Sequence, residues 1–125
     1  MLFFSSLNGR VIPYKQALAL KELGFDEPCF GYFNTNNREL FLDNSNNRTS
    51  NDDDRWCSAP TFSQAFRWFR EKYNLHNGIY PYYDEYEFQI KDFRLPTNQP
   101  INGGLMPYEE AELACLNKLI EIVKK

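Results

Sequence analysis

The segment TFSQAFRWFREKY spans residues 61–73 and mixes aromatic rings with arginines. On a helix, with about 100° per residue, its small and aromatic side chains fall on one stripe. The stripe consists of Phe62, Ala65, Phe66, Phe69 and Tyr73. This spacing is typical of a helix that packs on a core, and burying each phenylalanine contributes roughly 1.5–3 kcal/mol. The segment therefore predicts an amphipathic helix with its phenyl rings turned inward.

The rest of this helix carries Arg67, Trp68 and Arg70. In one interpretation these residues form a solvated face, where arginine stems cover apolar surface and Trp68 fills the seam to a neighbouring element. In a second interpretation they bind a partner or ligand, because Trp and Arg are enriched at interface hot spots. Nucleic-acid recognition by the same face is a third. The binding interpretations require the indole of Trp68 to face outward between the two guanidinium groups.

Outward from this segment, residues 13–23 predict a short helix that begins at Pro13, where a missing N–H has no consequence. Gly24 is expected to end this helix as the left-handed residue of a Schellman motif. In that motif Phe25 packs on Leu20.

Strand-forming residues flank turns at two places in the chain. Residues 29–33 and 39–42 lie on either side of the asparagine-rich NTNNR and predict a hairpin. Residues 79–95 predict a second hairpin, in which apolar and polar side chains alternate from Tyr86 to Ile90.

Residues 107–125 predict a last helix, with glutamates near its start and lysines at its end. The element order αββαββα gives an α+β fold, with three helices packed on one face of a small, mostly antiparallel sheet of two hairpins. The length favours a single domain over residues 1–125. Residues 43–58 are almost wholly polar, and we expect them to form a mobile loop within that domain.

Charge and composition narrow the classes of function. A net charge of −3 argues against a surface devoted to phosphate binding. Three widely spaced cysteines and a single histidine fit no zinc site and indicate reduced thiols, so we expect no metal and no other cofactor. The sequence shows no signal peptide and no membrane-spanning run, which predicts a cytoplasmic chain without membrane contact.

The second hairpin is another candidate binding surface because it is rich in tyrosine. Its tyrosines are Tyr80, Tyr82, Tyr83 and Tyr86. Tyrosine suits strands, and it also suits recognition surfaces because it offers a large contact area at low entropic cost. Half of these rings must face away from a core, so Tyr82 and Tyr83 are candidates, although β-propensity alone explains them equally well.

Glu112 lies near the centre of the buried side of the last helix. It is either in water beyond the edge of the sheet, or partly buried with a raised pKa, where it pairs with an arginine or marks a pocket. It is the sole candidate carboxylate for a catalytic cleft. The sequence has no nucleophile with a nearby base and no phosphate-binding glycine loop, so we expect no enzyme.

Three segments together resemble a known family. They are YKQALALKELGFDEPCFGY (residues 14–32), APTFSQAFRWFREKYNL (59–75) and YEEAELACLNKLIEIVK (108–124). They are similar, in this order, to small uncharacterised proteins encoded by phages and prophages of gut Bacteroidales. The resemblance implies expression in the cytoplasm of an infected bacterium. The family carries no assigned activity, and this chain departs from it in the polar stretch of residues 44–56.

We therefore expect a non-enzymatic phage accessory protein that binds a host protein or a small ligand, as counter-defence factors do. The expected binding residues are Arg67, Trp68, Arg70, Tyr82, Tyr83 and Glu112. The alternative is a nucleic-acid-binding or regulatory module that uses the Arg/Trp helix face, whose affinity would fall steeply with salt. The sequence leaves the oligomeric state open, a homo-oligomer included.

Overall fold

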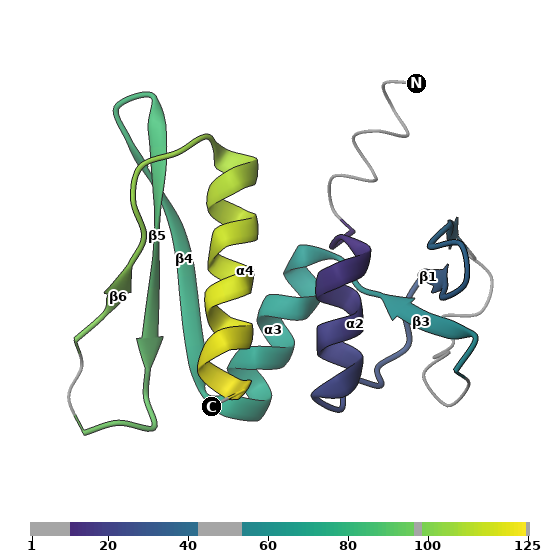
Figure 1. Cartoon of the computed structure of the whole chain (residues 1–125). Coiled ribbons are helices and arrows are strands. Elements are labelled where there is room, and N and C mark those ends of the chain that lie inside the picture. Colours follow the sequence, from purple (N-terminus) through teal and green to yellow (C-terminus); the bar gives the residue numbers. More distant parts are fainter. Residues whose placement is uncertain (1–10, 43–53, 97–98, 125) are drawn as a thin grey trace. The chain divides into compact units, whose positions relative to one another are not determined.

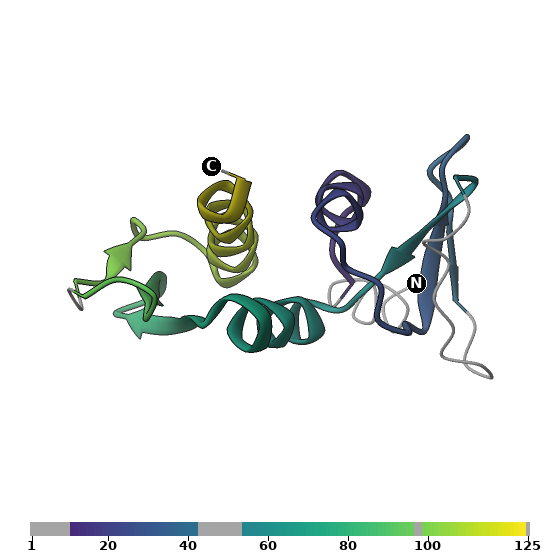
Figure 2. The same ribbon diagram turned by 90° about the horizontal axis from the view of Figure 1, so that it is seen from below.

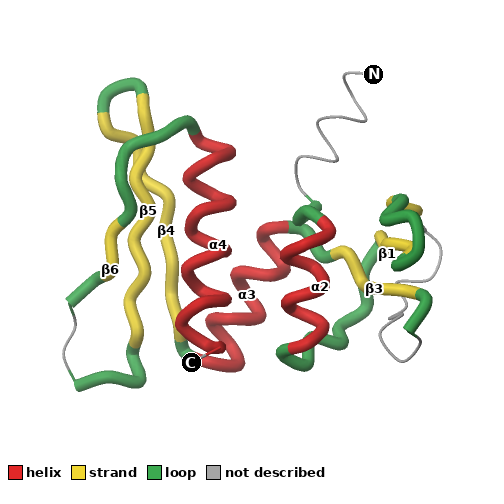
Figure 3. The backbone as a smooth tube through the Cα atoms, in the orientation of Figure 1, coloured by secondary structure: helices red, strands yellow, loops and turns green. Residues whose placement is uncertain are grey.

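The computed structural model describes residues 11–42, 54–96 and 99–124 (Figure 1). Contacts divide the chain into two compact units, residues 1–63 and 64–125. Each unit has its own three-stranded antiparallel sheet, drawn in yellow in Figure 3. The α+β class and the order of helices and strands are confirmed. The prediction of one sheet is wrong, and a single domain remains a prediction.

The helix of the first unit is α2 (Tyr14–Glu22). After it, Gly24 has a φ of 101°. The Gly24 N–H donates to the Lys21 carbonyl at 3.0 Å, and the Phe25 N–H donates to the Leu20 carbonyl at 2.9 Å. These two bonds are the predicted Schellman motif. Leu20 and Phe25 are both buried, so the end of the helix is fixed together with part of the core.

The first sheet places β1 (Gly31–Asn34) between β2 (Leu40–Leu42) and β3 (Trp56–Ala59). The β1–β2 pairing confirms the first predicted hairpin. β3 corrects the predicted loop over residues 43–58, because the end of that stretch forms a strand paired with β1. Residues 43–53 lie outside the described residues.

One face of this sheet is buried on the side of α2. Phe33, Cys57 and Ala59 are buried there, and the ring of Tyr14 meets the Phe33 ring edge-on at 5.4 Å. The sheet and α2 therefore form the core of the first unit.

α3 (Phe62–Tyr73) crosses the boundary between the units and leads into the second sheet. The order of that sheet is β4 (Leu75–Tyr82), β5 (Glu85–Asp92) and β6 (Ile101–Asn102). α4 (Tyr108–Lys124) lies along one face of the sheet, as the end-on view in Figure 2 shows.

The β4–β5 hairpin pairs from Leu75 with Asp92 to Tyr82 with Glu85. Directly opposite residues lie on the same face of an antiparallel pair. Phe88 and Ile90 therefore share the face that α4 covers, and both are buried. This hairpin confirms the second predicted one, although β4 begins earlier than expected.

Replacing Gly24 with alanine should lower the free energy of unfolding by about 1 kcal/mol or more, since a side chain disfavours positive φ. Urea unfolding followed by circular dichroism measures this. The control is Gly104→Ala, because a Cβ there meets no atom within 4 Å and the backbone is not left-handed. Equal stability of the two variants would contradict the role of the Schellman motif.

Candidate functional site

The indole of Trp68 is buried, with 5% of the residue exposed. The outward-facing indole that the binding interpretations require is therefore wrong. Its ring meets the Phe69 ring at 5.1 Å and the Tyr73 ring at 5.5 Å, both edge-on. The Lys72 ammonium lies 5.4 Å from the Trp68 ring centroid. Lys72 thus lies over the ring, and the buried indole is not open to a partner.

Helical geometry explains this correction. Trp68 and Phe69 lie three and four residues after Ala65, so the three side chains share one side of α3. All three are buried, whereas Phe66 is only half-buried. The buried side of α3 is thus rotated toward Trp68 from the stripe that the aromatic spacing predicted.

Arg67 and Arg70 are exposed, as expected. Without an outward ring between them, they do not form the predicted ring–guanidinium surface. Arg67 and Arg70 are compatible with the solvated face of the first interpretation.

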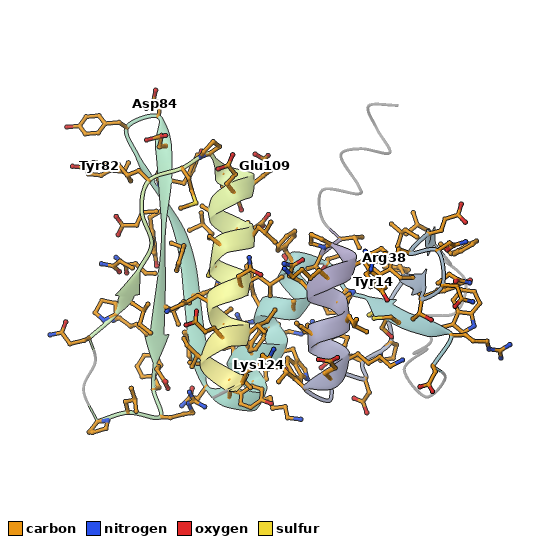
Figure 4. The ribbon with its side chains drawn as sticks, viewed as in Figure 1. Tyr14, Arg38, Tyr82, Asp84, Glu109 and Lys124 are labelled. Atoms are coloured by element: carbon orange, nitrogen blue, oxygen red, sulfur yellow. The ribbon has the colours of Figure 1, made fainter. Side chains whose placement is uncertain are left out.

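The tip of the β4–β5 hairpin carries three exposed tyrosines, Tyr80, Tyr82 and Tyr83, which we call the tyrosine tip. Their exposed fractions are 51%, 54% and 91%. The rings of Tyr82 and Tyr83 meet edge-on at 4.9 Å. Figure 4 shows Tyr82 and Asp84 at this end of the hairpin. The structure therefore gathers the second set of predicted binding residues on one exposed surface.

Tyr83 occupies a position that strand propensity does not explain. It is the first residue of a two-residue turn, and its φ is 60° while Asp84 has no positive φ. Such turns usually have glycine at this position, and a bulky residue there is strained by about 1–3 kcal/mol. The most exposed ring of the tip is thus held where folding alone disfavours it.

The Tyr80 ring packs over Gly78 on the outer face of the sheet. A Cβ built on Gly78 would collide with the Tyr80 ring, so the ring covers the bare backbone of the glycine two residues before it. Glycine in a strand leaves such a space for a neighbouring side chain. This contact holds the ring against the sheet, while half of the residue stays exposed.

Glu112, on α4, is half-buried. The Tyr108 hydroxyl donates to its Oε2 at 3.5 Å. A shallow, open hollow further along α4 is lined by Asn117, Ile120, Glu121 and Lys124, and Glu112 is not among them. The structure thus gives Glu112 a tyrosine partner without placing it in that hollow.

Two buried thiols have raised pKa values. Burial raises the pKa of Cys115 to about 12, although a hydrogen bond with the Asn77 side chain opposes the shift, and the Glu112 carboxylate adds to it. Burial raises the pKa of Cys57 to about 11, against the opposing charge of Lys21. The thiolate is the reactive form of cysteine, so neither residue is suited to act as a nucleophile near neutral pH.

Within the described ranges, no three His, Cys, Asp or Glu side chains gather in a way that would hold a metal ion. None of the helices in the described part of the chain is long and apolar enough to cross a membrane. Comparison of the chain with protein-family models, curated proteins and solved structures gives no match.

Three carboxylates around the tyrosine tip are not among the binding residues predicted from the sequence. They are Asp84, Glu85 and Glu87. The sequence does contain a signal for them, because residues 73–90 include these carboxylates and no lysine or arginine.

Replacing Trp68 with alanine should lower the free energy of unfolding by about 3–5 kcal/mol, because a large buried ring is lost. Arg70→Ala, two residues further along α3 on its exposed side, should change it by no more than about 0.5 kcal/mol. Chemical denaturation of both variants measures the difference. A Trp68→Ala variant as stable as Arg70→Ala would show that the indole is outside the core.

Iodoacetamide should alkylate Cys115 at pH 8 at least about 100-fold more slowly in the native chain than in urea, because burial removes access and suppresses the thiolate. Mass spectrometry of timed samples locates the label. Labelling of native Cys115 at a rate near that of the unfolded chain would contradict the buried thiol.

Proposed function

We propose that the chain is a non-enzymatic binding protein that contacts a partner protein through the tyrosine tip. The observation that carries this proposal is Tyr83, an almost fully exposed ring at a positive φ. Strain at such a position persists only where the surroundings maintain it, and it is concentrated at functional sites. Partner binding accounts for a ring that neither the core nor the turn requires.

A protein partner fits this surface better than a small ligand does. Small-molecule sites are concave and enclose most of the ligand, whereas the tyrosine tip lies at the end of a hairpin with its rings half or more exposed. Tyrosine is enriched among the residues that dominate protein–protein binding energy. Exposed rings at a hairpin end therefore favour recognition of a protein surface or segment.

The nucleic-acid alternative loses its main support. Binding of single-stranded nucleic acid combines cationic grooves with exposed rings on which bases stack. The Arg67 and Arg70 face has cations, but its indole is buried. The tyrosine tip has exposed rings, but no lysine or arginine occurs in residues 73–90.

We also propose that the partner is a host protein and that the chain acts as a phage accessory protein, for example in counter-defence. The support is the resemblance of residues 14–32, 59–75 and 108–124 to phage-encoded proteins. That support is an analogy at the level of the family and is independent of the argument for the tyrosine tip.

The test is a pull-down from phage-infected cells with tagged wild-type chain and Tyr83→Gly. Glycine removes the ring and tolerates the positive φ. The free energy of unfolding of the variant should therefore equal that of the wild type or be higher by up to about 0.5–1 kcal/mol. It should nevertheless lose the partner that the wild type recovers. Loss of binding without loss of stability would separate recognition from folding.

Two variants serve as controls. Arg38→Gly removes the backbone strain of a residue with a φ of 63° in the first unit and leaves the tyrosine tip unchanged. Phe30→Ser removes another exposed ring, also in the first unit. Both should recover the partner as well as the wild type does. Equal recovery of the partner by Tyr83→Gly would rule out the tyrosine tip as the contact surface.

A further inference from the structure

We propose that the outer face of the β4–β5 hairpin binds an extended, lysine- or arginine-rich segment of the partner protein. This inference rests on the proposed function and adds the chemistry of the partner. It is carried by the exposed rings of the tyrosine tip together with the charges that surround them.

The strand register places a glutamate opposite each tyrosine of the outer face. Tyr82 lies directly opposite Glu85, and Tyr80 lies directly opposite Glu87. Side chains that are opposite in an antiparallel pair share a face, with Cβ atoms about 4.5–5.5 Å apart. The outer face therefore presents two neighbouring pairs, each made of one tyrosine and one glutamate.

These carboxylates have no cationic partner in the part of the chain that the structure describes. Among the described residues, Asp84, Glu85 and Glu87 take part in no ion pair. Neither residues 73–90 nor residues 95–117 contain a lysine or arginine. Lys91 is the one lysine or arginine of residues 75–92 and shares the outer face, four residues from Glu87 or roughly 13 Å along β5. The three carboxylates outnumber it, so the tip of the hairpin keeps a negative potential that a cationic partner would neutralise.

The first turn of α4 adds charge of the same sign at this end of the unit. Tyr86 pairs with Met106 just before α4, and its ring meets the Tyr108 ring edge-on at 5.1 Å. Figure 4 shows Glu109 at the same end as Tyr82. The positive end of the helix dipole offsets part of the charge of this turn, so the hairpin carboxylates contribute most.

Ring and carboxylate together select a cation. Lysine and arginine are attracted to the face of an aromatic ring, and arginine also forms paired hydrogen bonds with a carboxylate. The same carboxylates repel a phosphate backbone or an acidic surface. Each tyrosine–glutamate pair therefore offers one cationic side chain both a ring face and an opposite charge.

The spacing of the pairs defines the form of the segment. Tyr80 and Tyr82 are two residues apart on β4, which is about 6.6 Å along a strand. An extended peptide places alternate side chains at the same interval. The segment that fits best is therefore extended, with lysine or arginine at every second position.

The test uses a fluorescein-labelled peptide of four arginine–serine repeats, titrated with the full chain and followed by fluorescence anisotropy. The triple variant Asp84→Asn/Glu85→Gln/Glu87→Gln should bind it about tenfold more weakly, since three exposed charge pairs contribute about 0.5 kcal/mol each. Tyr83→Gly should also weaken binding severalfold. A glutamate–serine peptide of equal length should not bind.

The matched control is Glu22→Gln/Asp26→Asn/Glu71→Gln, which neutralises three exposed carboxylates elsewhere and changes the net charge by the same amount. It should change the affinity by less than about twofold, as expected for screened charges that are not part of the hairpin. Equal weakening by both triple variants, or no binding of the arginine–serine peptide to the wild type, would overturn the inference.

The pull-down separates failure of this inference from failure of the proposed function. If Tyr83→Gly loses the partner while the hairpin triple variant keeps it, the tyrosine tip is the contact surface and the cationic segment is wrong. If both variants keep the partner, the proposed function itself fails. If both lose it and the peptide discriminates as stated, both proposals stand.

Discussion

The register of the β4–β5 hairpin is the constraint on which the second unit depends. It places Phe88 and Ile90 on the face beneath α4, and it places Tyr80 and Tyr82 on the opposite face. A slip of one residue would exchange the two faces and expose the core side chains. Burial of the inner face thus fixes the outer one, so that the exposed tyrosines and glutamates follow from the hydrophobic core beneath them.

Two residues of the hairpin, Gly78 and Tyr83, lower the stability of the fold and increase the exposed aromatic surface. Gly78 weakens the strand but leaves the space in which the Tyr80 ring lies. The backbone of Tyr83 is strained at a turn position that glycine would occupy without strain. Local choices that oppose folding are expected at functional sites. Together they distinguish this hairpin from one whose tyrosines serve only as strand formers.

Features that depend on neighbouring residues can be predicted from this sequence, whereas those that depend on distant residues cannot. The Schellman motif at Gly24 depends on residues next to it in the chain, and the period-two alternation through Phe88 reports its own strand. β3 was missed because Trp56–Ala59 is a short run within a polar stretch whose partner, β1, lies more than 20 residues earlier. Trp68 was misplaced because an aromatic stripe shows that a helix is amphipathic without fixing the centre of its buried side.

The candidate surface was only half predictable. Tyr82 and Tyr83 were identified from composition, but the backbone strain at Tyr83 and the pairing of each ring with a glutamate require the register. The most direct measurement is NMR of the isotope-labelled chain. The account predicts cross-strand contacts between Tyr80 and Glu87 and contacts from the Tyr80 ring to the Gly78 Hα protons. Cross-strand pairing of Tyr80 with Tyr86 or Phe88 instead would show a slipped register and contradict the account.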